Sequence, residues 1–492
     1  MNEKEKVERV DVCDVTRWEG QSIQLPEGPP GMGIPDAVKV LMKMHKHEES
    51  VVDIEEKVTG FPWDVARAFK VAMERLYGYS GHTEQVFAGM FGEVKVPPKE
   101  IAVEVAFEVY ENVPWGVFEL PGSEGALLEL KAGRDDRGRI AVVISTEIKR
   151  KYSGMVRELA EVTREVLRED SIYLGKAIKV EFCDESGGVL DMPTVGFISP
   201  KMLDKSVLVF NAGLEGELED YVYGPLRHGQ KEEYGRFGRE FKRGILLAGD
   251  HGTGKTLLTC RIAREAIDSG VTAIYIEDVK QLPHALNFAT TYLPAVIIGE
   301  DIDRAVQEER DDLTNVIFNT LDGIDTKDHE IMVVVTTNNP GKLHPGLLRP
   351  GRLDHRIFVD LPDADTVERL LWAYAEDQVG EGESLDGVAE ALVGIKPSQV
   401  KNVIDRAKDG MVRRYFDDGG SDKLMEGDLM TAALNFQKEE EMVQKATVKD
   451  EVKRFGLHEL EFVKKEGNGQ VKVDDKVKRV IREFAEHAER VM

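Results

Sequence analysis

The stretch Gly249-Asp250-His251-Gly252-Thr253-Gly254-Lys255-Thr256 decides the fold of this chain. It fits the pattern GxxxxGK[ST], in which glycines let the backbone wrap a phosphate group. The apolar run GILLA precedes it and the helical pattern LLTCRIAREAI follows, so the strand–loop–helix context of the pattern is present. Backbone N–H groups and the helix N-terminus would face the anion, Lys255 would reach the β- and γ-phosphates, and Thr256 would ligate Mg²⁺. The sequence therefore predicts a nucleotide-binding loop made of Gly249, Asp250, His251, Gly252, Thr253, Gly254, Lys255, Thr256 and Leu257.

Apolar runs on both sides of this loop predict a buried parallel sheet. GILLAG, TAIYI, PAVIIG and EIMVVVTT are too continuous for half-exposed strands, and they alternate with helical stretches. After Pro362 only helical patterns remain, as far as Gln437. We expect a large α/β domain over residues 206–360 and a small helical lid over residues 361–437.

The chain upstream of this core predicts a separate α+β domain over residues 1–205. A helical pattern runs from Pro35 to about Gly78, short alternating strands follow, and a long amphipathic helix starts near Tyr152. Two further strands, AIKVEF and TVGFI, are expected to close this domain near Pro200. No residue of this domain indicates a chemistry.

The last 55 residues, 438–492, form a charge-mixed tail that we expect to be partly helical. Five apolar residues repeat there at helical spacing and predict a terminal amphipathic helix: Val477, Val480, Ile481, Phe484 and Ala488.

Acidic and polar residues follow two of the predicted strands. PAVIIG ends in Glu300 and Asp301, and the strand from Ile331 ends near Asn338. The carboxyl ends of parallel strands are where an α/β sheet binds its ligands. One carboxylate would hold Mg²⁺ through water and its neighbour would orient or deprotonate the attacking water, while the Asn338 amide would bond the γ-phosphate or that water. A solvated acidic loop and an ordinary turn asparagine are the alternatives.

Two arginines, Arg349 and Arg352, lie 11 and 14 residues beyond Asn338. With them the region from about Val209 to Gln437 resembles an AAA ATPase of the classical protein-remodelling clade. In that resemblance the loop is Walker A, Glu300-Asp301 ends Walker B, Asn338 is sensor one, and LHPGLLRPGRLDHRI is the second region of homology.

The resemblance implies a fold, a reaction and an assembly. The fold would be a P-loop core with a parallel sheet and a helical lid, and the reaction would be hydrolysis of ATP to ADP and phosphate with Mg²⁺ held by Thr256 and Glu300. Arg349 and Arg352 would be arginine fingers that reach the ATP site of a neighbouring subunit, so a homo-oligomeric ring, expected to be a hexamer, is required. Ala212 and Gly213 would lie on the adenine side. Pairing of both arginines with local acids such as Asp354 and Asp360 is the structural alternative.

Residues 394–398 (GIKPS) lack the arginine that some relatives place there, as the classical clade does, so we assign them no catalytic role. The chain departs from the family pattern in three places. Its acid order is Glu-Asp, which mitochondrial Rieske-protein-translocating relatives share, whereas most members have Asp-Glu. Asp250-His251 stands where relatives carry a Pro pair. The segment 277–293 lacks the aromatic-Val-Gly pore loop, because its Phe288 and Tyr292 fit a helix face packed against the sheet.

Composition excludes several classes of function. Lys and Arg total 65 against 91 Asp and Glu, and the resulting net charge of −26 argues against a nucleic-acid partner. No apolar run approaches the length of a membrane helix, the start is too charged for a secretory signal, and the three scattered cysteines indicate a reducing compartment. We expect a cytoplasmic protein without a membrane span.

The leading hypothesis is a ring-forming ATPase that remodels, disassembles or translocates an unidentified protein partner, recognised by the N-terminal domain. A nucleic-acid motor or loader is the first alternative. A nucleotide-dependent assembly scaffold with little hydrolysis is the second, which the exchanged acid order keeps open.

Overall fold

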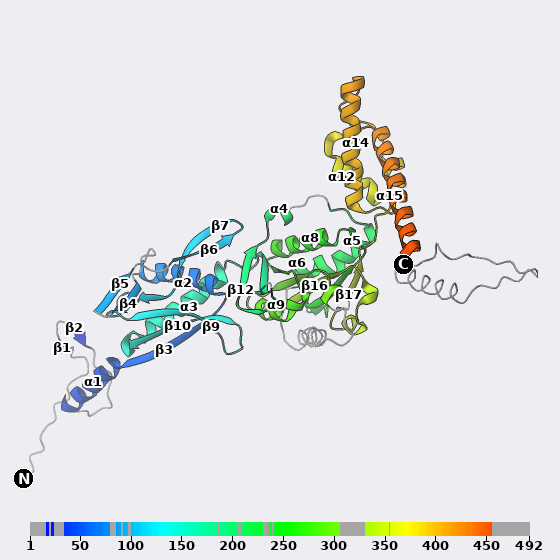
Figure 1. The fold of residues 1–492 in the computed structure, drawn as a ribbon. Coiled ribbons are helices and arrows are strands. Elements are labelled where there is room, and N and C mark those ends of the chain that lie inside the picture. The colour runs from blue at the N-terminus through cyan, green and yellow to red at the C-terminus, as the bar shows by residue number, and fades with distance from the viewer. Residues whose placement is uncertain are drawn as a thin grey trace, which may run out of the picture. The chain divides into compact units, whose positions relative to one another are not determined.

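A computed structural model describes most of the chain, in two compact units. The described residues are 16–18, 21–23, 34–78, 85–89, 92–96, 100–184, 186–203, 208–229, 234, 236–238, 241–305, 330–353 and 355–454. The first unit lies within residues 1–205, 217–248 and 256–357, and the second within 206–216, 249–255 and 358–492. Figure 1 shows their elements.

The N-terminal part of the first unit is an antiparallel sheet covered by two helices. Its strand order is β3-β10-β9-β8, with bounds Val51–Thr59, Ile140–Lys149, Leu127–Arg134 and Val117–Glu119. Helices α2 (Pro62–Tyr77) and α3 (Ser153–Glu169) pack on each other, and their apolar faces share one core with the sheet. The predicted α+β character and the long amphipathic helix are confirmed.

Smaller elements complete this part of the chain. They are helix α1 (Ile34–Glu48) and the strand pairs β1–β2 (Thr16–Trp18, Gln21–Ile23), β4–β5 (Gln85–Gly89, Gly92–Val96) and β6–β7 (Glu100–Ala106, Val109–Pro114). The expectation of continuous helix from Pro35 to Gly78 is wrong, because β3 separates α1 from α2. Its residues VVDIEEKVT alternate in burial, the period of a strand with one face in the core.

The second sheet of this unit has seven strands in the order β12-β11-β14-β15-β16-β13-β17. Five of them, β11, β14, β15, β16 and β13, are parallel. Their bounds in sheet order are Val189–Phe197, Ala177–Cys183, Thr272–Ile276, Ala295–Gly299, Ile331–Thr337, Arg243–Ala248 and His355–Phe358. All residues of β15 and β16 are buried, as expected for parallel strands covered on both faces.

The two strands β11 and β12 correct a sequence expectation. We placed AIKVEF and TVGFI in the N-terminal domain, yet β11 pairs in parallel with β14 and β12 forms the edge of the seven-stranded sheet. The predicted boundary at residue 205 therefore does not separate two sheets. Local alternation indicates a strand, but the distant partner of that strand is set by tertiary packing.

Helices flank the seven-stranded sheet. Helix α8 (Lys255–Asp268) and helix α9 (Leu282–Ala289) lie on opposite faces of the sheet in Figure 1. Helix α8 connects β13 to β14 across the sheet, and α9 connects β14 to β15 in the opposite direction. Right-handed crossovers in opposite directions place their helices on opposite faces. Short helices complete the region: α4 (Pro200–Leu203), α5 (Ala212–Leu218), α6 (Gly224–His228) and α10 (Ile302–Ala305).

Aromatic side chains join the start of α2 to this sheet. Tyr173 and Phe288 pack edge-on against Phe61, and the Phe61 N–H donates to the Tyr292 hydroxyl over 2.9 Å. Phe288 and Tyr292 are both buried, which confirms that they pack in the core, but Phe288 alone lies on α9 and Tyr292 follows the end of that helix.

The second unit contains a helical bundle. Its helices are α12 (Ala364–Ala375), α13 (Asp386–Ala391), α14 (Pro397–Asp418) and α15 (Glu426–Arg454), around a common apolar core. The all-helical lid is confirmed, but α15 runs on through the predicted boundary at residue 437. The terminal helix predicted around Val477–Ala488 lies outside the described residues. Within the described chain, no helix combines the length and apolar character that a membrane span needs.

Candidate functional site

The predicted phosphate loop lies between β13 and α8. Strand β13 ends at Ala248 and α8 begins at Lys255, so the loop comprises the residues between them. The Lys255 side chain is almost buried, and its Nζ donates to the carbonyl oxygens of Gly249 (2.6 Å) and Asp250 (2.7 Å). The lysine of the motif is thus held within its own loop.

Three positions of this loop need glycine. Gly252 and Gly254 have φ of +84° and +103°, which a side chain rarely permits. A Cβ on Gly249 would collide with the carbonyl oxygen of Val359, so at this position the backbone packing excludes a side chain. The glycine spacing in the motif therefore follows from conformation and close approach.

The ends of β15 and β16 bring the predicted acid and the predicted amide together. The two strands are parallel neighbours, with Gly299 opposite Val335. Asp301 then accepts a hydrogen bond from Asn338 Nδ2 at Oδ1 (2.7 Å), and its own N–H donates to Thr336 Oγ1 (3.0 Å). Asp301 has φ of +54°, a strained conformation for a residue with a side chain. These two hydrogen bonds fix Asp301 at the sheet edge.

Glu300 turns toward the other neighbours of β15. Its Oε1 accepts from Thr259 Oγ1 over 3.5 Å, and Thr259 lies on α8 one turn after Thr256. Burial, and then the Glu300 carboxylate, raise the pKa of Tyr275 on β14. The two acids therefore lie in different surroundings, Glu300 beside α8 and β14, and Asp301 beside β16.

Asp303 is a buried acid at this edge that the sequence interpretation left without a role. Its Oδ1 accepts from Thr337 Oγ1 (3.0 Å) and the Asn338 N–H (3.2 Å), and its Oδ2 from Asn339 Nδ2 (3.3 Å). Burial acts to raise the pKa of Asp303, but these hydrogen bonds outweigh it and the pKa lies below its ordinary value. Asp303 thus holds the segment that carries Asn338. Its only sequence signal was the spacing of two residues from Asp301.

Asp303→Ala is expected to destabilise the fold at neutral pH by about 2–3 kcal/mol, because the buried Thr337 hydroxyl and the half-buried donors of Asn338 and Asn339 lose their acceptor. Urea unfolding of this variant, compared with Asp405→Ala on the exposed face of α14, measures the effect. Since the folded pKa is depressed, the contribution is complete well above the ordinary value of 3.8 and is lost as the pH falls below it. Equal stability of the two variants at pH 7 would contradict this role.

The two predicted arginines differ in their surroundings. Arg349 is exposed, and its guanidinium forms no hydrogen bond or ion pair with any residue that the structure describes, while its carbonyl oxygen accepts from the Arg352 N–H over 3.1 Å. Arg352 is half-buried, and its Nη1 donates to the Gly346 carbonyl oxygen over 2.7 Å. The predicted partner Asp354 lies outside the described residues. A side chain on Gly244 of β13 would collide with the Arg352 carbonyl, so this segment packs directly on the sheet.

In the second unit, the segment before α5 is clamped to the start of the lid. Asn211 Nδ2 donates to the Leu361 carbonyl (3.1 Å), and the Asp363 N–H donates to Asn211 Oδ1 (3.2 Å). Ala212 and Gly213 follow, exposed at the start of α5.

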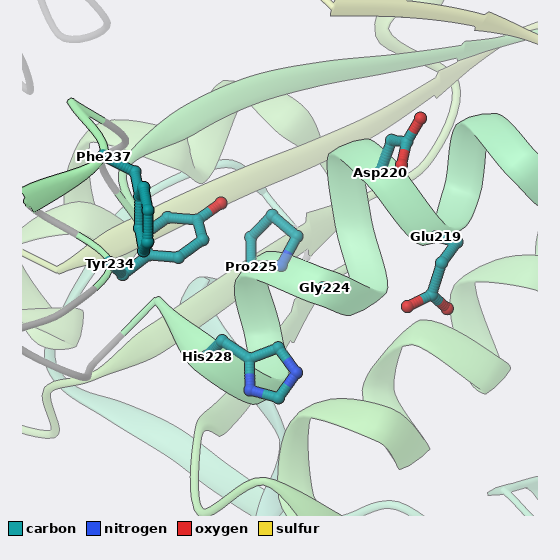
Figure 2. Close-up of a pocket in the computed structure, with 7 residues that line it drawn as sticks. All are labelled: Glu219, Asp220, Gly224, Pro225, His228, Tyr234 and Phe237. Carbon is teal, nitrogen blue, oxygen red and sulfur yellow. The ribbon is translucent and has the colours of Figure 1, made fainter.

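A hollow of about 450 Å³ lies beside the short helix α6, away from every predicted site residue (Figure 2). Tyr234, Phe237 and Pro225 surround one end of it in Figure 2, and Glu219 and Asp220 lie toward the other. Gly224 and His228 complete the lining.

Comparison with known proteins places this geometry in context. Residues 245–361 match the family described as "ATPase family associated with various cellular activities (AAA)". The chain is 33% identical over 208 residues to "ATP-dependent zinc metalloprotease FtsH 2" of Sphaerobacter thermophilus, which covers 39% of this chain and 31% of that relative. It is 28% identical over 246 residues to "26S proteasome regulatory subunit 4 homolog" of Schizosaccharomyces pombe, which covers 45% of this chain and 54% of that relative. The chain thus spans between a third and about half of the length of these curated relatives.

Proposed function

Residues 245–361 form an AAA ATPase domain, and we propose that the whole chain is an ATP-hydrolysing, ring-forming ATPase that remodels, disassembles or translocates a protein partner. The observation that carries this proposal is the pairing of Asp301 with Asn338 over 2.7 Å at the edge of the sheet whose strand β13 leads into the phosphate loop. A cradle for phosphates and an oriented carboxylate are the two parts that hydrolysis needs.

The surroundings of the two acids support a division of roles. Glu300 lies on the side of α8, the helix that carries Thr256, and the oxygen donors of these two residues suit Mg²⁺, a hard cation. When bound, the ion would neutralise negative charge on the nucleotide phosphates. Asp301 is held by Asn338 and Thr336 instead, as a residue that orients or deprotonates water must be.

The exposed side chain of Arg349 supports the proposal of a ring. Its guanidinium has no partner in the described part of its own chain, so it is available to a second copy. A planar cation of this kind suits charge that develops on a transferring phosphoryl group. We propose a hexameric ring in which Arg349, with Arg352 beside it, serves the ATP site of the adjacent subunit.

A protein is the class of partner that the relatives support, since their names describe a protease and a proteasome subunit. We propose that residues 1–205 recognise this partner. Phe288 and Tyr292 are buried in the core and are not free to grip a threaded polypeptide, so remodelling or disassembly suits the chain better than continuous threading. We propose a cytoplasmic location, which a cysteine thiol such as that of Cys183 suits.

The proposed roles of Asp301 and Glu300 predict different effects when each acid is replaced by its amide. Asp301→Asn is expected to bind ATP and leave it unhydrolysed, because the carboxylate that activates water is removed while Glu300 stays. Glu300→Gln is expected to weaken Mg²⁺-dependent ATP binding. Single-turnover assays with radiolabelled ATP, together with binding titrations with and without Mg²⁺, separate the two. If both variants turned over ATP at the wild-type rate, the proposed function would be wrong.

A further inference from the structure

Tyr275 lies on the same face of the seven-stranded sheet as Glu300. Strands β14 and β15 are parallel neighbours, and Tyr275 is the register partner of Ile298. Because side chains alternate along a strand, the residue two positions beyond Ile298 is expected on the same face, and that residue is Glu300. A cavity of about 20 Å³ is lined by Tyr275 and Ile298 from the sheet and by Thr259 from α8. This face of the sheet is therefore the one that α8 covers.

Two hydroxyl groups approach the Glu300 carboxylate. Its Oε1 lies 3.5 Å from Thr259 Oγ1 on α8, and the Tyr275 phenol on β14 is its second side-chain hydrogen-bond partner. Thr259 also donates to the Thr256 carbonyl oxygen over 2.8 Å, and a hydroxyl group carries a single proton. The Tyr275 phenol forms no other hydrogen bond within the described residues, so its proton is available to Glu300.

Packing alone does not explain the hydroxyl group of Tyr275. Apolar side chains make up most of the lining of the cavity beside its ring, among them Ala263, Ala273 and Ile298. A phenylalanine ring would fill this space equally well. A phenol in apolar surroundings finds a hydrogen-bond partner at its polar end, and here that partner is the Glu300 carboxylate.

The length of the Glu300 side chain gives this contact a use. The first acid of the pair is one methylene longer than the aspartate of the usual Asp-Glu order, so it has more rotamer freedom to lose when it is fixed. A hydrogen bond to a charged carboxylate is stronger than one between neutral groups. A donor on the largely buried strand β14 therefore favours one arrangement of this long side chain over the others.

We propose that Tyr275 is a positioning residue that keeps the Glu300 carboxylate turned toward α8, where Thr256 supplies the other oxygen donor proposed for Mg²⁺. The inference rests on the proposed function and adds to it a residue that acts through Glu300. Loss of the phenol hydroxyl would free Glu300 to adopt other arrangements, so a divalent cation would bind less tightly. Affinity for the nucleotide without a cation would not change.

The test removes the hydroxyl group and keeps the ring. Tyr275→Phe is compared with Tyr374→Phe, which makes the same change at a half-buried tyrosine of lid helix α12. The probe is Mn²⁺, whose free electron paramagnetic resonance signal is lost as it binds to each full-length variant with a non-hydrolysable ATP analogue. Tyr275→Phe is expected to weaken Mn²⁺ binding about fivefold, the effect of one net hydrogen bond. The control, and binding of the analogue without a cation, are expected to stay within about twofold of wild type.

A second comparison tests whether the effect passes through Glu300. In a Glu300→Gln background, Tyr275→Phe is expected to change Mn²⁺ affinity by less than about twofold, because the charged group that the phenol holds is gone. An equal fivefold loss in both backgrounds would show that the hydroxyl acts on the fold and not on Glu300, and the positioning role would be wrong.

Failure of this inference is distinct from failure of the proposed function. If wild type binds the nucleotide analogue and Tyr275→Phe binds Mn²⁺ as tightly as Tyr374→Phe does, the positioning role is wrong and the ATPase assignment stands. If wild type binds no nucleotide, both proposals fall.

Discussion

Lys255→Ala is expected to abolish ATP binding, with an affinity loss of at least about a hundredfold. The ammonium of Lys255 is almost buried and is held by the carbonyl oxygens of Gly249 and Asp250, so it occupies the centre of the loop rather than its rim. Removing it deletes the cation that is expected to face the phosphates, and it takes one hydrogen-bond donor from each of the Gly249 and Asp250 carbonyls.

Isothermal titration with ATP and Mg²⁺ measures this loss, and thermal melting with and without nucleotide checks it. Lys280→Ala is the matched control, since Lys280 is an exposed lysine outside the loop. Wild type and the control should gain thermal stability with ATP, and Lys255→Ala should gain none. ATP binding by Lys255→Ala at the wild-type affinity would show that the loop does not hold the phosphates.

Arg349→Ala is expected to preserve ATP binding and to lower turnover by about a thousandfold, the range typical of a missing arginine finger. The Arg349 guanidinium is exposed and has no partner in the described chain, and substitution by alanine keeps the backbone carbonyl that accepts from the Arg352 N–H. The loss would therefore arise at a neighbouring copy. Arg352 cannot replace it, because its guanidinium is already bound to the Gly346 carbonyl.

Steady-state phosphate release and nucleotide titration separate turnover from binding in this variant. Arg356→Ala is the control, because Arg356 is also exposed and lies seven residues further on, in β17. We expect the control to retain turnover. If Arg349→Ala hydrolysed ATP as fast as the control, Arg349 would not be a finger.

The sequence predicted the central strands of the core better than the edge of its sheet. Apolar runs and the glycine motif sufficed for β13 to β16 and for α8, because parallel strands are buried on both faces and carry an unmistakable pattern. The addition of β11 and β12 to the same sheet was missed, since pairing over nearly a hundred residues leaves no local signal. The strand β3 was missed because its alternation lies between two helical patterns.

Prediction of the candidate site from sequence has the same limit, because contacts between distant segments leave no local signal. The motif identified the loop residues and the acid pair, and the strand ends predicted that Asp301 and Asn338 would share an edge. The contacts of Thr259 and Asp303 join segments that are distant in the chain, and a residue three positions after Thr256 or two after Asp301 looks ordinary in sequence. Side chains that act by holding others carry no motif of their own.

The most direct test of the central claim is the ATP turnover of two inactive variants mixed in equal amounts. Arg349→Ala keeps the loop and the acids, and Asp301→Asn keeps the arginine, so each supplies what the other lacks. If adjacent copies build each ATP site together, random mixing in a ring restores about a quarter of the wild-type turnover, because a quarter of the interfaces are complete. If the mixture stays as inactive as its two components while both variants still assemble, the arginine does not act on a neighbouring subunit and the shared site is contradicted.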